Sequence, residues 1–88
     1  MKTFNDLEFK THPMGASFGI ISRIKFDNGY GASVVKGPHT YGGDRDLYEL
    51  AVTDADDQLT YETPITNDVE GYLTEEDVTK LLTQIQNL

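Results

Sequence analysis

The residues best suited to chemistry are concentrated in a loop at residues 36–43. The loop reads Lys-Gly-Pro-His-Thr-Tyr-Gly-Gly. Successive backbone N–H groups at Gly42 and Gly43 can form a concave anion-binding site, to which Lys36 and His39 would add positive charge. The pattern matches neither the phosphate-binding loop nor the dinucleotide-binding motif, and a strand rather than a helix follows it. The loop therefore predicts either a site for a nucleotide-like anion or a tight crossover in which glycine supplies a positive φ.

Other residue types that support catalysis are present without the spacing that catalysis needs. His12 and His39 are the only histidines, each beside a proline, and the chain has no cysteine. A metal site would require both to converge with carboxylates, and two exposed loop histidines are the alternative. No serine carries the signature of an activated nucleophile, and the acidic run from Asp54 to Asp57 lacks the glycine and glutamate of a calcium loop. We predict no catalytic residue, no metal and no cofactor, and so no enzyme.

Tyrosines are the aromatic residues that suit a binding surface, and the chain has five of them beside four phenylalanines. Each combines a large ring with a polar tip. If Tyr30 and Val34 share an uncovered sheet face, they form part of an apolar patch that would mark a partner or a self-association surface. The alternative is that loops or the N-terminal strand cover this face. The predicted partner-binding residues are Tyr30, Val34, Tyr41, Asp44, Asp46 and Tyr48.

Charge is distributed unevenly along the chain. The net charge is −8, of which residues 1–45 contribute +2 and residues 46–88 contribute −10. So acidic a half disfavours contact with nucleic-acid phosphates over most of the surface. It fits either a solvated acidic face or a protein partner with a basic surface.

The elements that would position these residues start from a hairpin at Asn28-Gly29. A two-residue type I′ turn requires positive φ at both central positions, which Asn and Gly tolerate best. That turn sets Phe26 opposite Gly31 and places Val34 on the other face of the sheet. A change of register by one residue would exchange the two faces.

The rest of the chain predicts further strands and one helix. Thr74 is placed as the N-cap, with Asp77 three residues later, and Leu73 and Val78 stand at the staple positions. Apolar residues then recur at helical spacing from Val78 to Ile85. The predicted strands are residues 1–10, 17–27, 30–36, 46–53 and 59–63. The prediction is a single α+β domain spanning residues 1–88, an antiparallel β-sheet of four to five strands packed against one C-terminal α-helix.

Size and hydropathy bound the setting. No apolar run approaches the roughly 20 residues that span a bilayer, and residues 1–10 are too polar for a secretory signal. We therefore expect no membrane partner. A domain of 88 residues has a thin core, and self-association is a common remedy. We expect a homo-oligomer, most simply a dimer.

Several longer stretches carry a family resemblance. The stretches are Asn-Gly-Tyr-Gly-Ala-Ser-Val-Val from residue 28, Thr-Tyr-Gly from residue 40, Leu-Tyr-Glu-Leu-Ala-Val from residue 47, Thr-Pro-Ile-Thr-Asn-Asp-Val from residue 63 and Gly-Tyr-Leu-Thr from residue 71. They resemble a family of small uncharacterised proteins encoded by bacteriophages and prophages. The resemblance implies action in the host bacterial cytoplasm and carries over no site residue.

Together these observations favour one function and leave one alternative. The favoured function is that of a small acidic accessory protein which binds another protein, such as an inhibitor of a host or defence protein. The acidic half would steer it to a basic surface and the tyrosines would anchor it. The alternative is a protein that binds or sequesters a nucleotide-like anion through the loop at residues 37–43.

Overall fold

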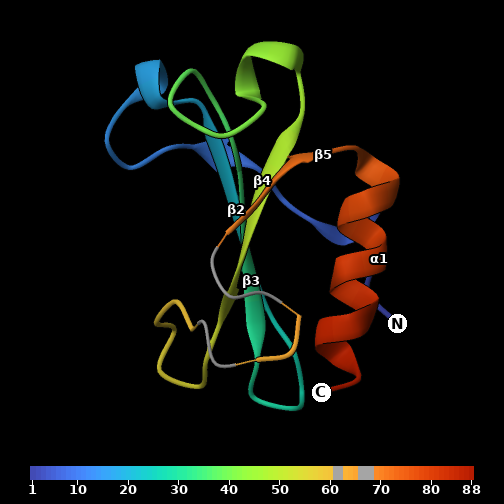
Figure 1. Cartoon of the computed structure of the whole chain (residues 1–88). Coiled ribbons are helices and arrows are strands. Elements are labelled where there is room, and N and C mark those ends of the chain that lie inside the picture. The colour runs from blue at the N-terminus through green and yellow to red at the C-terminus, as the bar shows by residue number, and fades with distance from the viewer. Residues whose placement is uncertain (61–62, 66–68) are drawn as a thin grey trace.

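The computed structural model describes residues 1–60, 63–65 and 69–88. In this part of the chain, five strands form one sheet in the order β1-β2-β3-β4-β5, and every neighbouring pair is antiparallel (Figure 1). One α-helix follows at the C-terminal end, so the predicted α+β class is confirmed. The elements are the 3-10 helix η1 (Phe4–Asp6), β1 (Lys10–Thr11), the 3-10 helix η2 (Ala16–Phe18), β2 (Ile20–Lys25), β3 (Gly31–Lys36), the 3-10 helix η3 (Gly43–Arg45), β4 (Tyr48–Thr53), β5 (Glu70–Leu73) and α1 (Glu75–Gln86).

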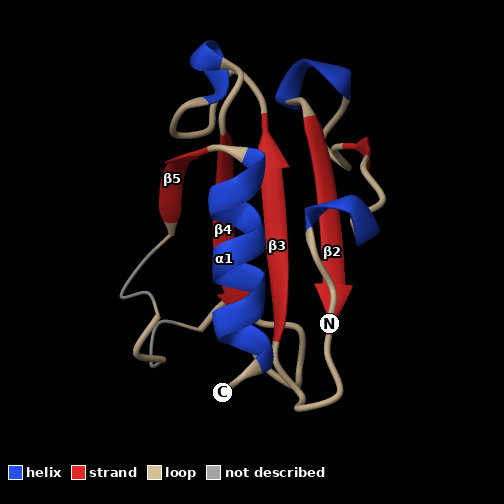
Figure 2. Cartoon of the chain, turned by 90° about the vertical axis from the view of Figure 1, so that its right-hand side faces the viewer, coloured by secondary structure: helices blue, strands red, loops and turns tan. Residues whose placement is uncertain are grey.

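Helix α1 packs on one face of the sheet, in front of β3 and β4, and η1 lies beside it on the same side (Figure 2). Alternating residues of the strands meet the helix there, because side chains of a strand alternate between the two faces. No α-helix of the described residues packs on the other face of the sheet. Completely buried side chains in this two-layer core are Ala32, Val34, Leu50, Val52, Val78, Leu82 and Ile85.

The helix begins where its capping residues predict. The Asp77 amide donates to Thr74 Oγ1 at 3.1 Å, and the Thr74 amide donates to Asp77 Oδ2 at 3.0 Å. Hydrogen bonds to the Asp77 carboxylate from the backbone and the side chain of Thr74 hold the pKa of Asp77 below its ordinary value. Leu73 and Val78, which stand at the predicted staple positions before and after the cap, are both buried. No helix in the described ranges is long and apolar enough to cross a membrane.

The β2–β3 hairpin differs from the prediction by one residue. The Gly29 amide donates to the Phe26 carbonyl at 3.1 Å, and the Phe26 amide donates to the Tyr30 carbonyl at 2.8 Å. Only Gly29 of the loop has a positive φ, at 89°. The predicted type I′ turn at Asn28-Gly29 is therefore wrong: the loop has three residues, 27–29, and ends in a bulged glycine.

This change of register exchanges the faces of β3. Ala32 lies opposite Ile24, and Val34 lies opposite Ser22, on the side of the helix. Val34 and Ala32 are fully buried. The predicted exposed patch containing Val34 is thus not formed, because the three-residue loop turns its side chain into the core.

The side chain of Asn28 forms two hydrogen bonds that the predicted turn does not include. Its side-chain oxygen accepts a hydrogen bond from the Tyr30 amide at 3.0 Å, and its side-chain nitrogen donates to the Ile85 carbonyl at 2.8 Å. Carbonyls in the last turn of a helix have no partner within the helix. Asn28 therefore ties the hairpin to the C-terminal end of α1.

The predictions for the outer strands are only partly met. Within residues 1–10 the structure has η1 instead of a long strand, and Leu7 and Phe9 pack against the core. Of the predicted strand at residues 59–63, Leu59 forms one isolated bridge with Thr53, while residues 61 and 62 lie outside the described residues. The fifth strand is β5, where the sequence predicts no strand.

Candidate partner-binding site

The glycine loop, residues 37–43, is held together by its own hydrogen bonds. The Gly43 amide donates to the Thr40 carbonyl at 3.2 Å, and the Gly37 amide donates to Thr40 Oγ1 at 3.0 Å. Gly42 has a φ of 96°, as the tight-crossover interpretation predicts. The Gly43 amide, one of the two predicted to bind an anion, is thus already used within the loop.

The two predicted cationic groups of the anion site are engaged in other contacts. Lys36 Nζ lies 2.7 Å from Asp46 Oδ1 and 4.9 Å from the centre of the Tyr48 ring. The hydrogen bond with Asp46 is the main cause of a raised pKa at Lys36. The His39 ring packs against Phe18, with ring centres 5.0 Å apart. The arrangement favours a structural role for these residues over anion binding.

The predicted partner-binding residues separate into buried and exposed groups. Val34 is fully buried and Tyr48 is only 8% exposed. The Tyr48 ring packs against Phe4 at 5.1 Å and against Phe9 at 5.6 Å. Tyr48 is therefore a core residue, and its predicted place on an exposed surface is wrong.

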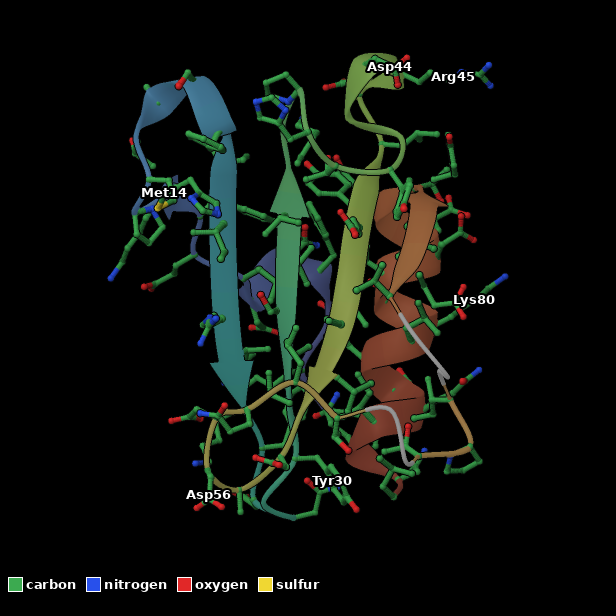
Figure 3. The ribbon with its side chains drawn as sticks, turned by 60° about the vertical axis from the view of Figure 1, so that its left-hand side comes forward. Met14, Tyr30, Asp44, Arg45, Asp56 and Lys80 are labelled. Carbon is green, nitrogen blue, oxygen red and sulfur yellow. The ribbon has the colours of Figure 1, made fainter. Side chains whose placement is uncertain are left out.

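The exposed members do not form one surface either. Asp44 lies at one end of the sheet, whereas Tyr30 lies at the opposite end, near Asp56 (Figure 3). Tyr30 is half-buried and packs against the core. Asp46 is exposed but pairs with Lys36. Of the predicted aromatic residues, only Tyr41 is largely exposed, at 62%.

Tyr41 lies beside Tyr72, a neighbour that the sequence does not predict. The Tyr72 amide donates to the Tyr41 carbonyl at 3.0 Å. Tyr72 is 56% exposed, so two tyrosine side chains face solvent from adjoining backbone segments. We call these two residues the tyrosine pair. Monomers rarely expose large apolar groups together without a binding role.

A β-bulge produces this arrangement. On β4 and β5, Tyr48 lies opposite Leu73 and Leu50 lies opposite Glu70, with a register shift between them. Two residues of β5 therefore stand where β4 has one. The second of them, Tyr72, has a φ of 56°. A bulge redirects a side chain, and here it turns the Tyr72 side chain out to solvent.

Glycines make the backbone contact geometrically feasible. A Cβ atom at Gly71 would overlap the Cβ of Tyr41, and a Cβ at Gly42 would lie 2.8 Å from the Cα of Tyr72. Each tyrosine thus lies against a glycine of the opposing segment. The left-handed conformation of Tyr72 costs about 1–2 kcal/mol, which the surrounding packing must offset.

Carboxylates surround the tyrosine pair. The Tyr41 amide donates to Glu49 Oε2 at 3.3 Å. Exposed acids also flank the pair along the chain: Asp44 follows Tyr41 in η3, and Glu70 precedes Tyr72 in β5. The first turn of α1 adds Glu75 and Glu76. Arg45 in η3 and Lys36, which pairs with Asp46, also lie at this end of the sheet, so acidic residues outnumber basic ones around the tyrosine pair.

Neither residue of the tyrosine pair lines the surface hollows of about 750, 280 and 240 Å³ that the described residues form. In the described ranges, no three His, Asp or Glu side chains are close enough together to hold a metal ion. The tyrosine pair is consequently the candidate for a surface contact with a macromolecule. Tyr72 is one of the five tyrosines that suit a binding surface, but nothing in the sequence places it beside Tyr41, which is 31 residues away along the chain.

Comparisons of the chain with protein-family models, with curated proteins and with solved structures gave no match.

Proposed function

We propose that this protein acts by binding another protein through the tyrosine pair and the carboxylates around it. The observation that carries the proposal is the exposure of Tyr41 and Tyr72, at 62% and 56%, on backbone segments joined by a hydrogen bond. Tyrosine is among the residues that contribute most to binding energy at interfaces.

The backbone beneath the tyrosines supports this proposal. Gly42 and Gly71 lie in close contact with the opposing segment, and Tyr72 keeps a left-handed conformation. Strained backbone persists only where its surroundings impose it, and such positions cluster at functional sites. A surface ordered before binding loses less conformational entropy when the partner arrives.

Charge supports a partner with a basic surface. Residues 46–88 contribute −10 to the net charge, and Asp44, Glu49 and Glu70 lie next to the tyrosines. Opposite potentials accelerate association and exclude acidic competitors. On the family resemblance, the partner is a host or defence protein in the cytoplasm of a bacterium that carries the phage, and the protein inhibits it by covering that surface.

A capture experiment with matched variants tests the proposal. Tagged protein is expressed in a bacterial host, and captured polypeptides are identified by mass spectrometry for wild type, Tyr72→Ala and Leu59→Ala. Leu59 is the control, since it is 45% exposed and pairs with Thr53 at the other end of β4. The affinity of the captured partner is then measured with purified components.

The proposal predicts that Tyr72→Ala weakens binding of the captured partner at least tenfold, while Leu59→Ala leaves it unchanged. The affinity of the wild type also falls as salt rises, because steering charges are screened. A partner whose affinity is the same for both variants would overturn the proposal. A wild-type dimer that Tyr72→Ala converts to a monomer would assign the tyrosine pair to self-association instead.

A further inference from the structure

The outer edge of β2 carries backbone groups that form no hydrogen bond with any other described residue. β2 spans six residues, Ile20–Lys25, but β1 pairs only with Ile20 and Ile21. Beyond Ile21, the register with β3 directs the amides of Ser22 and Ile24 toward β3 and those of Arg23 and Lys25 away from it. No hydrogen bond to the backbone of Arg23 or Lys25 is found in the described part of the chain.

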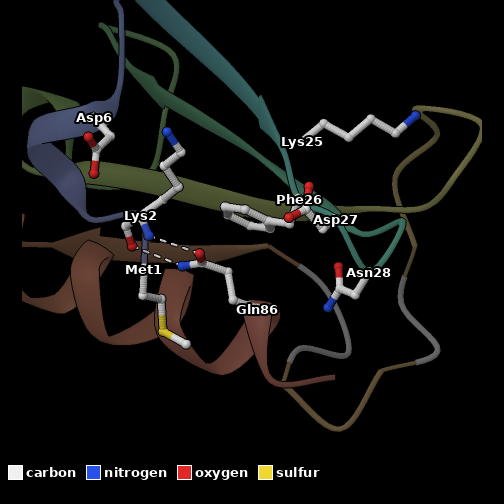
Figure 4. A pocket seen from close by; sticks show the side chains of 8 residues that line it. All are labelled: Met1, Lys2, Asp6, Lys25, Phe26, Asp27, Asn28 and Gln86. Carbon is white, nitrogen blue, oxygen red and sulfur yellow. Dashed lines mark hydrogen bonds between the residues drawn. The ribbon is translucent and has the colours of Figure 1, made fainter.

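The N-terminal segment leaves this edge open. It turns from β1 toward α1, where the Phe4 amide donates to Thr79 Oγ1 at 3.0 Å. Lys2 and Gln86 then exchange two hydrogen bonds of 2.9 Å (Figure 4). As a result, the N-terminal segment lies in front of β2 instead of beside its lower half (Figure 2).

Two hollows of the described residues adjoin this edge. One, of about 750 Å³, lies between the N-terminal segment and the end of β2, and Lys25, Phe26 and Gln86 are among its lining residues (Figure 4). The other, of about 280 Å³, is lined by Arg23 together with Glu8 and Lys10. Each leaves space beside the edge for an incoming side chain.

We infer that this edge binds an extended segment of another protein, which adds to the sheet as a strand beside Arg23 and Lys25. An open edge with free N–H and C=O groups is a template for such an addition. This surface is separate from the tyrosine pair, so the inference goes beyond the proposed function and stands independently of it.

Cross-strand pairing defines the chemistry of the added strand. Arg23 and Lys25 are exposed on the face of the sheet away from the helix, and carboxylates directly opposite them give favourable pairs. Lys25 already lies 3.4 Å from Asp57 in an exposed ion pair, so Arg23 contributes most of the preference for an acidic partner. Ile24 points to the helix side and packs against the core, so it favours an apolar neighbour. The strand therefore alternates acidic and apolar residues.

The chain itself contains this pattern next to β1. The residues before β1 are Asp6, Leu7, Glu8 and Phe9. Continuing the β1 register would set Glu8 opposite Arg23 and Asp6 opposite Lys25. In the structure Asp6 instead accepts a hydrogen bond from the Thr3 amide at 2.8 Å, and the edge stays unoccupied.

A second copy of the chain is a poor occupant. Antiparallel pairing of two β2 edges would bring Arg23 and Lys25 of one copy against the same residues of the other. Like charges placed directly opposite one another destabilise a sheet. Charge at this edge consequently selects an acidic strand of a different protein.

Amide hydrogen exchange followed by NMR tests the inference, with an acetylated and amidated peptide of alternating glutamate and valine as the probe. In the free protein, we expect the amides of Arg23 and Lys25 to exchange at least a hundredfold faster than those of Ser22 and Ile24. Excess peptide should slow the exchange of Arg23 and Lys25. A lysine–valine peptide of equal length should bind about tenfold more weakly.

Two variants separate the backbone contribution from that of the side chain. Arg23→Pro removes an amide that does not serve the β2–β3 ladder, so it should abolish peptide binding while the fold is kept. Arg23→Gln keeps the amide and should weaken binding only severalfold. If Arg23→Pro does not fold, the exchange experiment on the wild type still decides.

Three results would overturn the inference. The first is slow exchange at Arg23 and Lys25 in the free protein, which would show that residues 6–9 already occupy the edge in solution. The second is no binding of the glutamate–valine peptide. The third is binding that Arg23→Pro leaves intact.

Discussion

The two ends of the strand order, β5 and β1, are protected in opposite ways. β5 donates a hydrogen bond from Tyr72 to the glycine loop and leads directly into α1. β1 is two residues long, and no other described residue pairs with the outward backbone groups of Arg23 and Lys25 in β2. At β5 the exposed groups are aromatic side chains, whereas beside β1 they are amides and carbonyls.

The two proposals thus assign two kinds of recognition surface to one small sheet. The surface at β5 depends on close packing and on a strained residue, so its shape is fixed before binding. The surface beside β1 depends on what is left unpaired, so it changes little when side chains are replaced. Substitutions should therefore affect the two edges with very different magnitudes.

The largest effect is expected at the contact between the glycine loop and β5. Gly42→Ala places a Cβ at 2.8 Å from the Tyr72 Cα and at a φ of 96°. We expect a loss of roughly 2–4 kcal/mol in the free energy of unfolding, from overlap together with backbone strain. Urea denaturation measures it.

Gly29→Ala is the matched control. Gly29 has a φ of 89°, and the added Cβ meets only the Cβ of Ala55, at the ordinary contact distance of 3.9 Å. The control should lose only about 1 kcal/mol, the strain contribution alone. Equal losses in the two variants would show that the contact with Tyr72 does not constrain the loop.

The next effect concerns the cap that joins β5 to α1. Thr74→Ala removes the oxygen that accepts the Asp77 amide at 3.1 Å, and it should cost about 1 kcal/mol of unfolding free energy. Thermal unfolding monitored by circular dichroism measures this cost. Thr83→Ala is a control from the same helix, and it should cost less because Thr83 caps no helix start.

The same cap predicts a pH dependence. The folded state holds the pKa of Asp77 below its ordinary value, so its stabilisation is complete above that ordinary value and is lost as pH falls through the lowered one. Asp77→Asn should therefore be less stable than wild type at neutral pH, with a gap that narrows in acid. A gap that is constant between pH 7 and about pH 2 would contradict this assignment.

Tyr72→Asn should change stability and binding in opposite directions. Asparagine tolerates the left-handed region better than tyrosine, so relief at a φ of 56° should raise the unfolding free energy by up to about 1 kcal/mol. Binding of the captured partner should fall, because the ring is lost. Chemical denaturation and calorimetric titration report the two effects, and a destabilised variant would refute the assignment of strain.

The smallest effect is expected for the ion pairs. Lys36→Ala removes the pair with Asp46 and the contact with the Tyr48 ring, and it should cost at most about 1 kcal/mol. Lys25→Ala, at the opposite end of the sheet, removes a longer pair with Asp57, of 3.4 Å, in which the lysine is more exposed, and it should cost less. Unfolding at low and high salt compares them, and a larger loss for Lys25→Ala would reverse this ranking.

The sequence predicts the fold best where residues close together in the chain determine the local structure. The cap at Thr74 and Asp77 predicts the helix start, because both partners lie within one turn. The Asn28-Gly29 pair predicts a hairpin but not its register, since glycine can supply positive φ in a two-residue or a three-residue loop. That one-residue difference buried Val34.

The tyrosine pair is harder to predict from the sequence, because it depends on a contact between distant segments. Tyr41 could be named from its residue type, but Tyr72 becomes its neighbour only through the bulge in β5. Gly71 and the left-handed Tyr72 break the alternation that identifies a strand, so the sequence does not predict β5. Tyr48 was misplaced for a related reason: the sequence does not show that Phe4 and Phe9 cover it.

The hydrogen bonds between Lys2 and Gln86 can form only late in biosynthesis. These residues are separated by 84 positions along the chain, so the N-terminal segment emerges from the ribosome long before its partner exists. Contacts of such long range slow folding, because a large loop must close before they form. Linking residues 2 and 86 through a short connector, with new ends opened elsewhere, would make the contact local, and such a circular permutant should fold faster.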